Sequence, residues 1–355
     1  MRWEIAAPAI LYLLYRAYLH NSLTPTAILV AGATATVHAL HPSPLPFTLL
    51  GVFFLLGTSA TKVKKEVKAT LTLPSTGSHT RSSSSNVLAD VFSGGWNKTK
   101  EYHEKQEATK KNASTAGGQE PRSAIQVLAN SGCATLLCSL YLALYGYGAQ
   151  QVEGCFGSVP ARDLILAGII ANYAAVAADT FSSELGILSS HKPRFILSLK
   201  EVPPGTNGGI TGMGLGAGLG GALVIGAVSA LLLPTSCDGE AADVLGLVLA
   251  VGSWGALGSV LDSILGALFQ ASVVDRRSGK VIEAPNGGKV LVGAKKEKGE
   301  EKDEGKPSRI LGSGTDILDN NQVNILMAAT MTVGAMLLVS QAWNAPLSSL
   351  WIRVK

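Results

Sequence analysis

Residues 210–233 read ITGMGLGAGLGGALVIGAVSALLL, and this stretch decides the fold class. It contains no ionisable side chain and exceeds the roughly 20 residues that a helix needs to cross a bilayer core of about 30 Å. Comparable runs occupy 123–147, 242–271 and 323–343, and shorter but adequate runs occupy 159–178 and 44–60. Two weaker runs at 3–19 and 24–40 precede them, the first interrupted by Arg16. We therefore predict an all-α, polytopic transmembrane bundle with seven or eight spanning helices.

Composition supports the same class. Hydrophobic residues make up 47% of the 355 positions and charged residues only 15%, whereas a soluble domain carries about 25% charged residues. The amino terminus has no clear small-x-small cleavage site, so we expect it to be retained. The net charge of +4 is modest. We expect a membrane lipid as partner and no nucleic acid.

The distribution of Lys and Arg predicts the orientation, because basic connecting segments stay in the cytosol. Segments 62–122 and 276–309 are rich in basic residues, and 189–209 carries three more. Segments 149–160 and 234–243 are nearly free of them and are predicted to face the lumen or exterior. Two cytosolic stretches, 75–118 and 295–306, have the composition of flexible loops.

These observations predict the following organisation. Amino-terminal transmembrane helices occupy 1–61, a basic flexible cytosolic loop 62–122, and a core bundle 123–271 with a cytosolic motif loop at 179–209. A second cytosolic loop occupies 272–321, and a last helix with its tail 322–355. We expect an integral protein of the endoplasmic reticulum or another endomembrane.

Four cysteines do not make a metal site or a disulfide framework. Cys133 and Cys138 fall inside an apolar run, where small packed residues are expected. Cys155 and Cys237 fall in the two connections predicted to face the lumen, where an oxidising compartment would let a disulfide persist.

An acidic residue near membrane depth costs free energy, so its presence indicates a functional or structural role. Asp179 and Glu184 end the run that begins at 159, and Asp262 lies in the last third of the run 242–271. The orientation places all three carboxylates at the cytosolic boundary, where they are predicted to approach one another as catalytic groups and ligands of Mg²⁺. Asp319, Asn320 and Asn321, with Asp316 before them, precede the last run. We predict that Asp319, Asn320 and Asn321 bind phosphate of the substrate or nucleotide; helix capping is the competing interpretation, above all for Asp316.

Residues 202–212 read VPPGTNGGITG and lead into the run 210–233. Gly205, Thr206, Asn207, Gly208 and Gly209 could present backbone N–H groups to a phosphate at a helix amino terminus; a plain Pro-Gly turn is an equal alternative. The later glycines are spaced four apart, Gly212, Gly216 and Gly220 in one series and Gly214, Gly218, Ala222 and Gly226 in another. Both series predict close helix packing.

Basic residues flank the same boundary. Lys62 follows the run 44–60, and Arg122 precedes the run 123–147. Such residues usually anchor a helix at the cytosolic surface, and they could also bind phosphate beside the acidic site.

Several motifs together resemble the integral-membrane family that contains plant phytyl-phosphate kinase and animal transmembrane protein 19. They are GTSATKVK at 57–64, IQVLAN at 125–130, DTFSSELG at 179–186, VPPGTNGG at 202–209, GSVLDSILGA at 258–267 and ILDNN at 317–321. They occur in the family's order, although Phe181 replaces its usual tryptophan and 75–118 is a long insertion.

This resemblance implies a phosphotransferase that converts an isoprenoid monophosphate into a diphosphate, with Mg²⁺ and a nucleoside triphosphate, CTP or ATP, as cosubstrate. The lipid phosphate and the nucleotide would meet at the cytosolic face. Two other classes remain open: a transporter, for which acids at membrane depth are also expected, and a scaffold without catalysis.

Overall fold

The computed structural model describes residues 3–75, 121–146, 155–233, 241–290 and 308–351. Most of the predicted flexible stretch 75–118, all of 295–306, and Cys237 lie outside these residues. Cys155 is disulfide-bonded, so the prediction that this cysteine takes part in a disulfide is confirmed. Cys133 and Cys138 are free thiols, as predicted for packed residues inside a helix.

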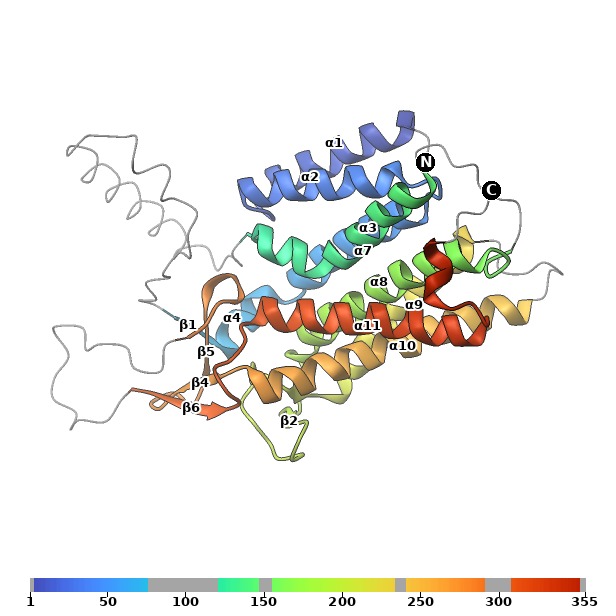
Figure 1. The fold of residues 1–355 in the computed structure, drawn as a ribbon. Coiled ribbons are helices and arrows are strands. Elements are labelled where there is room, and N and C mark those ends of the chain that lie inside the picture. The colour runs from blue at the N-terminus through green and yellow to red at the C-terminus, as the bar shows by residue number, and fades with distance from the viewer. Residues whose placement is uncertain (1–2, 76–120, 147–154, 234–240, 291–307, 352–355) are drawn as a thin grey trace, which may run out of the picture.

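In the described part of the chain, eight long helices run back and forth between the two ends of a bundle (Figure 1). They are α1 (Trp3–Leu19), α2 (Pro25–Leu40), α3 (Leu45–Lys62), α7 (Ala124–Tyr145), α8 (Pro160–Gly186), α9 (Gly212–Leu232), α10 (Ala241–Phe269) and α11 (Asn320–Ala342). Among the described residues, six of them, α3 and α7 to α11, are long and apolar enough to cross a membrane, and α2 is a shorter apolar helix. The predicted polytopic helix bundle is confirmed.

Side-chain caps fix where four of these helices begin, and at α2 the Thr24 hydroxyl accepts a hydrogen bond from the Ala27 N–H. Ser123 and Gln126 form a reciprocal capping box at α7, and Asp319 and Gln322 form one at α11. Thr211 accepts a hydrogen bond from the Gly214 N–H at the start of α9. Such caps satisfy backbone donors that the first helical turn leaves free. Asp319, and not Asp316, therefore caps α11.

α8 is the central helix of the bundle, and most of its length is buried. Every residue from Asp163 to Ala178 is buried, as expected for a helix with neighbours on every side. Tyr173 faces α2, where its hydroxyl lies 2.8 Å from His38 Nε2, and Asn172 donates to the Asn130 carbonyl of α7 at 3.0 Å. The helix continues to Gly186, so Asp179 and Glu184 lie inside it and do not follow its end as the sequence suggested.

Glycines bring α8, α9 and α10 together at backbone distance. A Cβ on Gly218 of α9 would lie 2.9 Å from the Ala178 oxygen of α8, and one on Gly255 of α10 only 2.6 Å from the Ala174 oxygen. This confirms the packing role of the series that contains Gly214 and Gly218. The other series was predicted wrongly, because Gly212, Gly216 and Gly220 face open space.

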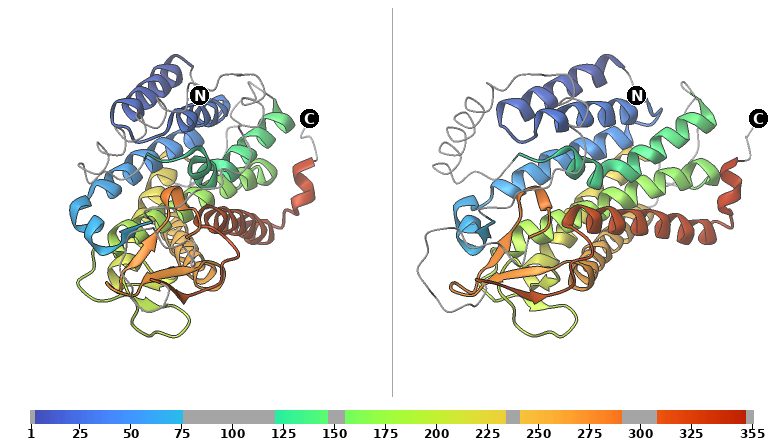
Figure 2. Two further views of the ribbon diagram at one scale, coloured as in Figure 1. Left: turned by 90° about the vertical axis from the view of Figure 1, so that its left-hand side faces the viewer. Right: turned by 60° about the vertical axis from the view of Figure 1, so that its left-hand side comes forward.

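A small sheet covers one end of the bundle, which we call the sheet end (Figure 2). Its strand order is β1 (Leu73–Pro74), β5 (Val281–Glu283), β4 (Ser272–Asp275) and β6 (Arg309–Ser313), with β1 parallel to β5 and the other neighbours antiparallel. The short helix α4 (Lys65–Leu71) precedes β1, the turn η1 (Pro285–Gly287) follows β5, and η2 (Leu347–Trp351) closes the described chain. Segment 272–321 thus contains three strands where a loop was predicted.

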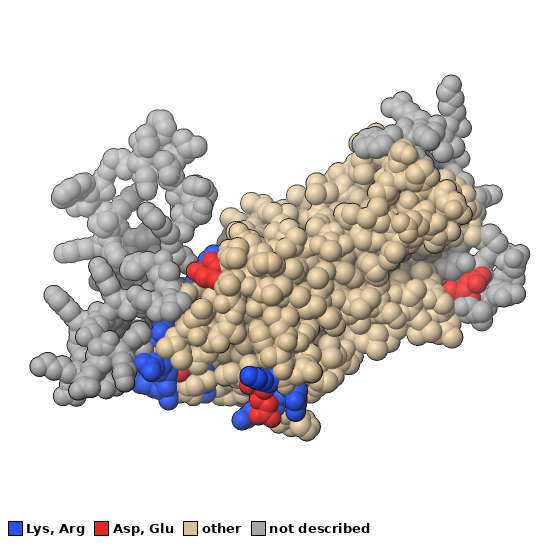
Figure 3. Space-filling model, turned by 60° about the horizontal axis from the view of Figure 1, so that its bottom comes forward, with Lys and Arg blue, Asp and Glu red and all other residues tan. Residues whose placement is uncertain are grey.

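A second pair of short strands, β2 (Arg194–Phe195) and β3 (Gly209–Ile210), frames the loop between α8 and α9 at the same end. The described parts of the basic connections that were predicted to share one side of the membrane lie together at the sheet end (Figure 1). The face shown in Figure 3 has a broad uncharged band with charged side chains at its margins. This is the pattern of a surface that contacts a bilayer core.

Candidate functional site

Two carboxylates from different helices meet near the sheet end. Asp179 of α8 and Asp262 of α10 lie within hydrogen-bonding contact of each other. Glycine packing makes this approach possible, because Gly258, one turn before Asp262, lies against Ala175, one turn before Asp179. Both side chains are half-buried. We call Asp179 and Asp262 the carboxylate pair.

An amide from a third helix completes the polar surroundings of the pair. With its amide nitrogen turned toward Asp262, Asn324 of α11 donates to Asp262 Oδ1 at 3.3 Å and to the Asn320 carbonyl at 3.0 Å. In this orientation the amide nitrogen of Asn324 faces two oxygen acceptors, which is why the orientation is assigned. The carboxylate pair is therefore positioned by three helices that are far apart in sequence.

The glycine loop, residues 202–209, packs on α10 beside the pair. A Cβ on Gly208 would lie 2.8 Å from the Ser263 carbonyl, one residue after Asp262, and Gly208 has φ +77. Only glycine combines this backbone conformation with so close an approach. The loop thus forms a wall at the turn of α10 that carries Asp262.

Several N–H groups of the glycine loop already have protein acceptors. Thr206 N–H donates to the Pro203 carbonyl, Asn207 N–H to Ser272 Oγ at 2.9 Å, and Gly209 N–H to the Thr206 carbonyl. The Asn207 amide also donates to the Ala271 carbonyl at 3.1 Å. These contacts hold the loop against the end of α10 and the start of β4. They are what the turn interpretation predicts, which the sequence left equal to phosphate binding.

Glu184 does not join the carboxylate pair but forms an ion pair on another face of α8. Lys68 Nζ of α4 lies 2.7 Å from Glu184 Oε2, and both side chains are largely shielded, with 11% and 18% exposure. Lys68 also donates to the Ala60 carbonyl at the end of α3. Because it ties α3, α4 and α8 together, the pair fixes one side of the site.

Arg122 lies close to the same face of α8. Its two terminal guanidinium nitrogens each stand 3.6 Å from the point that a Cβ on Gly57 would occupy, and Thr180 Cγ2 is equally close to that point. Burial lowers the pKa of Arg122, and the nearby Glu184 carboxylate opposes this lowering. We call Lys68, Arg122 and Glu184 the basic corner; its net charge is positive.

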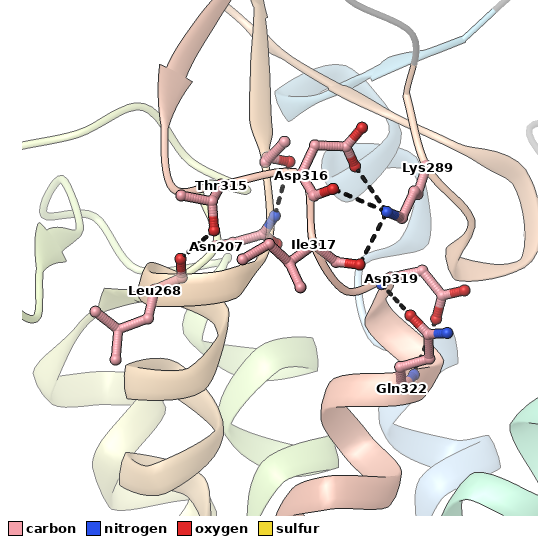
Figure 4. A network of polar contacts seen from close by, with 9 residues as sticks. Asn207, Leu268, Lys289, Thr315, Asp316, Ile317, Asp319 and Gln322 are labelled. Atoms are coloured by element: carbon pink, nitrogen blue, oxygen red, sulfur yellow. Dashed lines mark hydrogen bonds and ion pairs between the residues drawn. The ribbon is translucent and has the colours of Figure 1, made fainter.

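The other predicted phosphate-binding residues have varied surroundings. Lys62 is exposed at the end of α3. Asn320 accepts a hydrogen bond from Gln270 at 3.5 Å, and Asn321 donates to the Asn286 carbonyl at 2.9 Å. Asp316 pairs with Lys289 at 3.2 Å, close to the Asp319 cap (Figure 4). These contacts join α11 to α10 and η1, and no contact of the carboxylate pair involves Lys62.

Lys68 and Asn324 are the site residues that sequence reasoning missed. Lys68 was counted only as one of many basic residues after α3, and its partner Glu184 is 116 positions away. Asn324 did carry a signal, because an amide one turn inside an apolar helix needs a polar neighbour.

The donors of the pair suit Mg²⁺. Carboxylate and amide oxygens are hard ligands, and Mg²⁺ typically takes one or two carboxylates while phosphates and waters supply the rest. Consistent with this, the described part of the chain holds no group of three or more His, Cys, Asp or Glu side chains arranged around one ion. The predicted triad therefore reduces to Asp179 and Asp262 as candidate ligands.

A helical bundle with long apolar helices and a polar site at one end defines a polytopic integral membrane protein. The chain belongs to the family described as integral membrane protein DUF92, whose model matches residues 8–97 and 87–332.

Two relatives illustrate this family. Protein PGR of Arabidopsis thaliana is 35% identical over 222 residues, which cover 61% of this chain and 69% of that protein. An uncharacterized membrane protein of Methanocaldococcus jannaschii is 44% identical over 105 residues, which cover 30% of this chain and 40% of that protein. No solved structure matches significantly.

Proposed function

We propose that this protein is a membrane-embedded phosphotransferase that converts an isoprenoid monophosphate into the diphosphate with a nucleoside triphosphate. The observation that carries the proposal is the contact between Asp179 and Asp262, contributed by two helices beside a basic corner. The resemblance of the chain's motifs to those of plant phytyl-phosphate kinase supports the isoprenoid substrate.

Two carboxylates in contact repel each other when both are ionised, so the pair favours a proton or a cation between them. Phosphoryl transfer uses such a cation, because the reaction depends on positioning and charge neutralisation more than on a covalent nucleophile. Asp179 and Asp262 would hold Mg²⁺, which supplies neutralising charge to the nucleotide phosphates when bound.

The chain's remaining groups have positions suited to the substrates. Arg122 would bind the lipid monophosphate, and Lys62, exposed at the end of α3, would reach phosphates arriving from outside the bundle. The glycine loop and the Asp319–Asn321 turn would form the walls near the nucleotide. An oxygen of the lipid monophosphate then bonds to the terminal phosphorus of the nucleotide, and the bond from that phosphorus to its bridging oxygen breaks. The nucleoside diphosphate leaves with that oxygen.

The proposal includes a location. The sheet end collects the basic connections, which are expected in the cytosol, so the nucleotide would come from the cytosolic pool of CTP or ATP. The endoplasmic reticulum or another endomembrane is the proposed site of residence.

A direct assay tests this function. Purified protein in nanodiscs would be mixed with farnesyl or geranylgeranyl monophosphate, Mg²⁺ and either CTP or ATP, and the lipid product resolved by mass spectrometry. We expect formation of the diphosphate with one equivalent of nucleoside diphosphate. The absence of product with both nucleotides and both lipids would reject the proposed activity.

Transport is the competing function, because the carboxylate pair lies within two spanning helices as proton-coupling acids do. The same nanodisc sample, reconstituted into liposomes with a pH-sensitive dye inside, separates the two. Substrate-driven proton movement without diphosphate formation would favour a transporter.

A further inference from the structure

An apolar cavity lies between α1, α2, α3 and α7, and Arg122 is the wall residue that it shares with the site described above. Its volume is about 80 Å³, and its walls include Ile10 and Leu14 of α1, Ala35 of α2, Gly51 and Phe54 of α3, and Val127 of α7. By the same kind of measure a single water needs roughly 10–15 Å³. The cavity is therefore several times larger than a single water, which leaves room for a short length of hydrocarbon.

The polar side chains that α7 contributes to the wall are satisfied within or at the start of their own helix. Asn130 donates to the Gln126 carbonyl at 2.9 Å, and Ser131 donates to the Val127 carbonyl at 2.8 Å. The Gln126 side chain accepts from the Ser123 N–H in the capping box. Among the described wall residues, Arg122 alone carries a full charge.

Arg122 connects the cavity to the site. It lines the cavity, and its guanidinium lies against Gly57 of α3 and close to Thr180, the residue after Asp179. Gly51, which lines the cavity, lies six residues before Gly57 on α3, a rise of roughly 9 Å at 1.5 Å per residue. One end of the space is thus cationic, and the other is hydrocarbon-like.

We infer that this cavity binds the head-proximal hydrocarbon of a single-chain lipid phosphate whose phosphate group contacts Arg122. This rests on the proposed function and names where its lipid substrate lies. The chain would occupy the α1–α2–α3–α7 side, and the phosphate would face α8, which carries Asp179. A single small cavity next to a single cation fits one chain and one anionic head group better than a two-chain phospholipid.

Gly51 offers a clean way to fill the cavity. A Cβ at Gly51 would meet no heavy atom within 4 Å, so a larger side chain can enter the space without a clash. Gly132 of α7 is the matched control, because its Cβ would also meet nothing within 4 Å and it is not part of the cavity wall. Gly51→Leu and Gly132→Leu therefore differ mainly in whether the added side chain occupies the cavity.

The test measures binding without nucleotide, so that it does not depend on catalysis. Thermal shift and calorimetric titration would use geranylgeranyl monophosphate, geranylgeraniol and dioleoyl phosphatidic acid as probes. For the monophosphate we expect Gly51→Leu to weaken binding at least tenfold and Gly132→Leu to leave it unchanged. The two-chain phosphatidic acid should bind the wild-type protein at least tenfold more weakly than the monophosphate.

Arg122 is tested by the difference between head groups. Arg122→Gln should weaken binding of the monophosphate at least tenfold and that of the uncharged alcohol less than twofold, while Arg122→Lys should restore most of the monophosphate affinity. Equal binding by Gly51→Leu and the wild-type protein, or equal losses for alcohol and monophosphate in Arg122→Gln, would overturn the inference.

The outcomes also separate this inference from the proposed function. Binding that depends on Gly51 and Arg122, without any diphosphate formation, would reject the phosphotransferase and keep the lipid site. If the protein forms diphosphate but Gly51→Leu binds the monophosphate as tightly as the wild-type protein, the cavity is not the lipid site. The proposed phosphotransferase activity would then still stand.

Discussion

Two halves of the bundle differ in how closely the backbones of their helices approach one another. In the glycine-packed half, α8, α9 and α10, backbones touch: a Cβ on Gly255 would lie 2.6 Å from the Ala174 oxygen. In the open half, α1, α2, α3 and α7, a Cβ on Gly51 or Gly132 would meet nothing within 4 Å, and an apolar cavity remains. The carboxylate pair belongs to the first half, where its two acids are fixed relative to each other. The second half has the space for a ligand.

The largest expected effect lies in the glycine-packed half. Asp262→Asn should reduce diphosphate formation by at least about 100-fold, because it removes a charge that is positioned for the transition state. Asp243→Asn is the control, since Asp243 is an exposed carboxylate in the first turn of the same helix, far from Asp262. Turnover measured in nanodiscs should be unchanged for this control. Near-normal turnover in Asp262→Asn would remove the carboxylate pair from the site.

The second prediction compares overpacking in the two halves. Gly255→Val should lower stability by about 1–3 kcal/mol, because its side chain must displace the backbone of α8. Gly51→Val should have a much smaller effect, since its side chain enters open space. Thermal unfolding of the detergent-solubilised proteins measures both. Equal losses of stability would contradict the contrast between the halves.

The third prediction concerns the wall of the site. Gly208→Ala combines a strained φ of +77 with a contact of 2.5 Å to the Ala267 Cβ, whereas Gly279→Ala has φ +69 and meets nothing within 4 Å. Both variants should lose roughly 1 kcal/mol from the backbone conformation. Only Gly208→Ala should also raise the nucleotide concentration needed for half-maximal rate, because the loop must move away from α10. An unchanged nucleotide requirement would leave the loop a turn without a role in binding.

The smallest expected effect lies at the seam between the halves. Tyr173→Phe removes the 2.8 Å hydrogen bond from α8 to His38 of α2 and should cost about 0.6 kcal/mol, the mean for such bonds between membrane helices. Turnover should not change, because the seam holds the halves together without touching the site. A loss of activity larger than the loss of stability would show that the two halves are coupled more closely than their packing indicates.

The sequence sufficed for the helices but not for all of the contacts between them. Apolar runs predict the spans because a bilayer imposes one length on each. The extension of α8 past Asp179 was missed, because its acids have partners on α10 and α4 that lie far away in sequence. Strands of two to five residues, β1 to β6, carry too little pattern to be recognised, and β1 pairs with β5 across about 200 positions.

The candidate site divides in the same way. Asp179, Asp262 and Arg122 were predicted because an ionisable residue beside an apolar run demands a reason. The position of Glu184 was predicted wrongly, because Glu184 forms a direct ion pair with Lys68 and does not join the carboxylate pair. Whether a glycine packs or faces open space depends on the rotation of its helix, which spacing alone does not fix; hence Gly218 was predicted correctly and Gly216 was not.

The central place of α8 has a consequence for how the protein is made. The chain is synthesised from its amino terminus, so α8 leaves the ribosome before α9, α10 and α11 exist to cover it. A carboxylate within a spanning helix costs up to about 2.5–3.5 kcal/mol during insertion by the translocon, depending on its depth. Asp179 meets Asp262 only after 83 further residues have been made. α8 should therefore remain beside the translocon, or associate with the earlier helices α2, α3 and α7, until α9, α10 and α11 have been made.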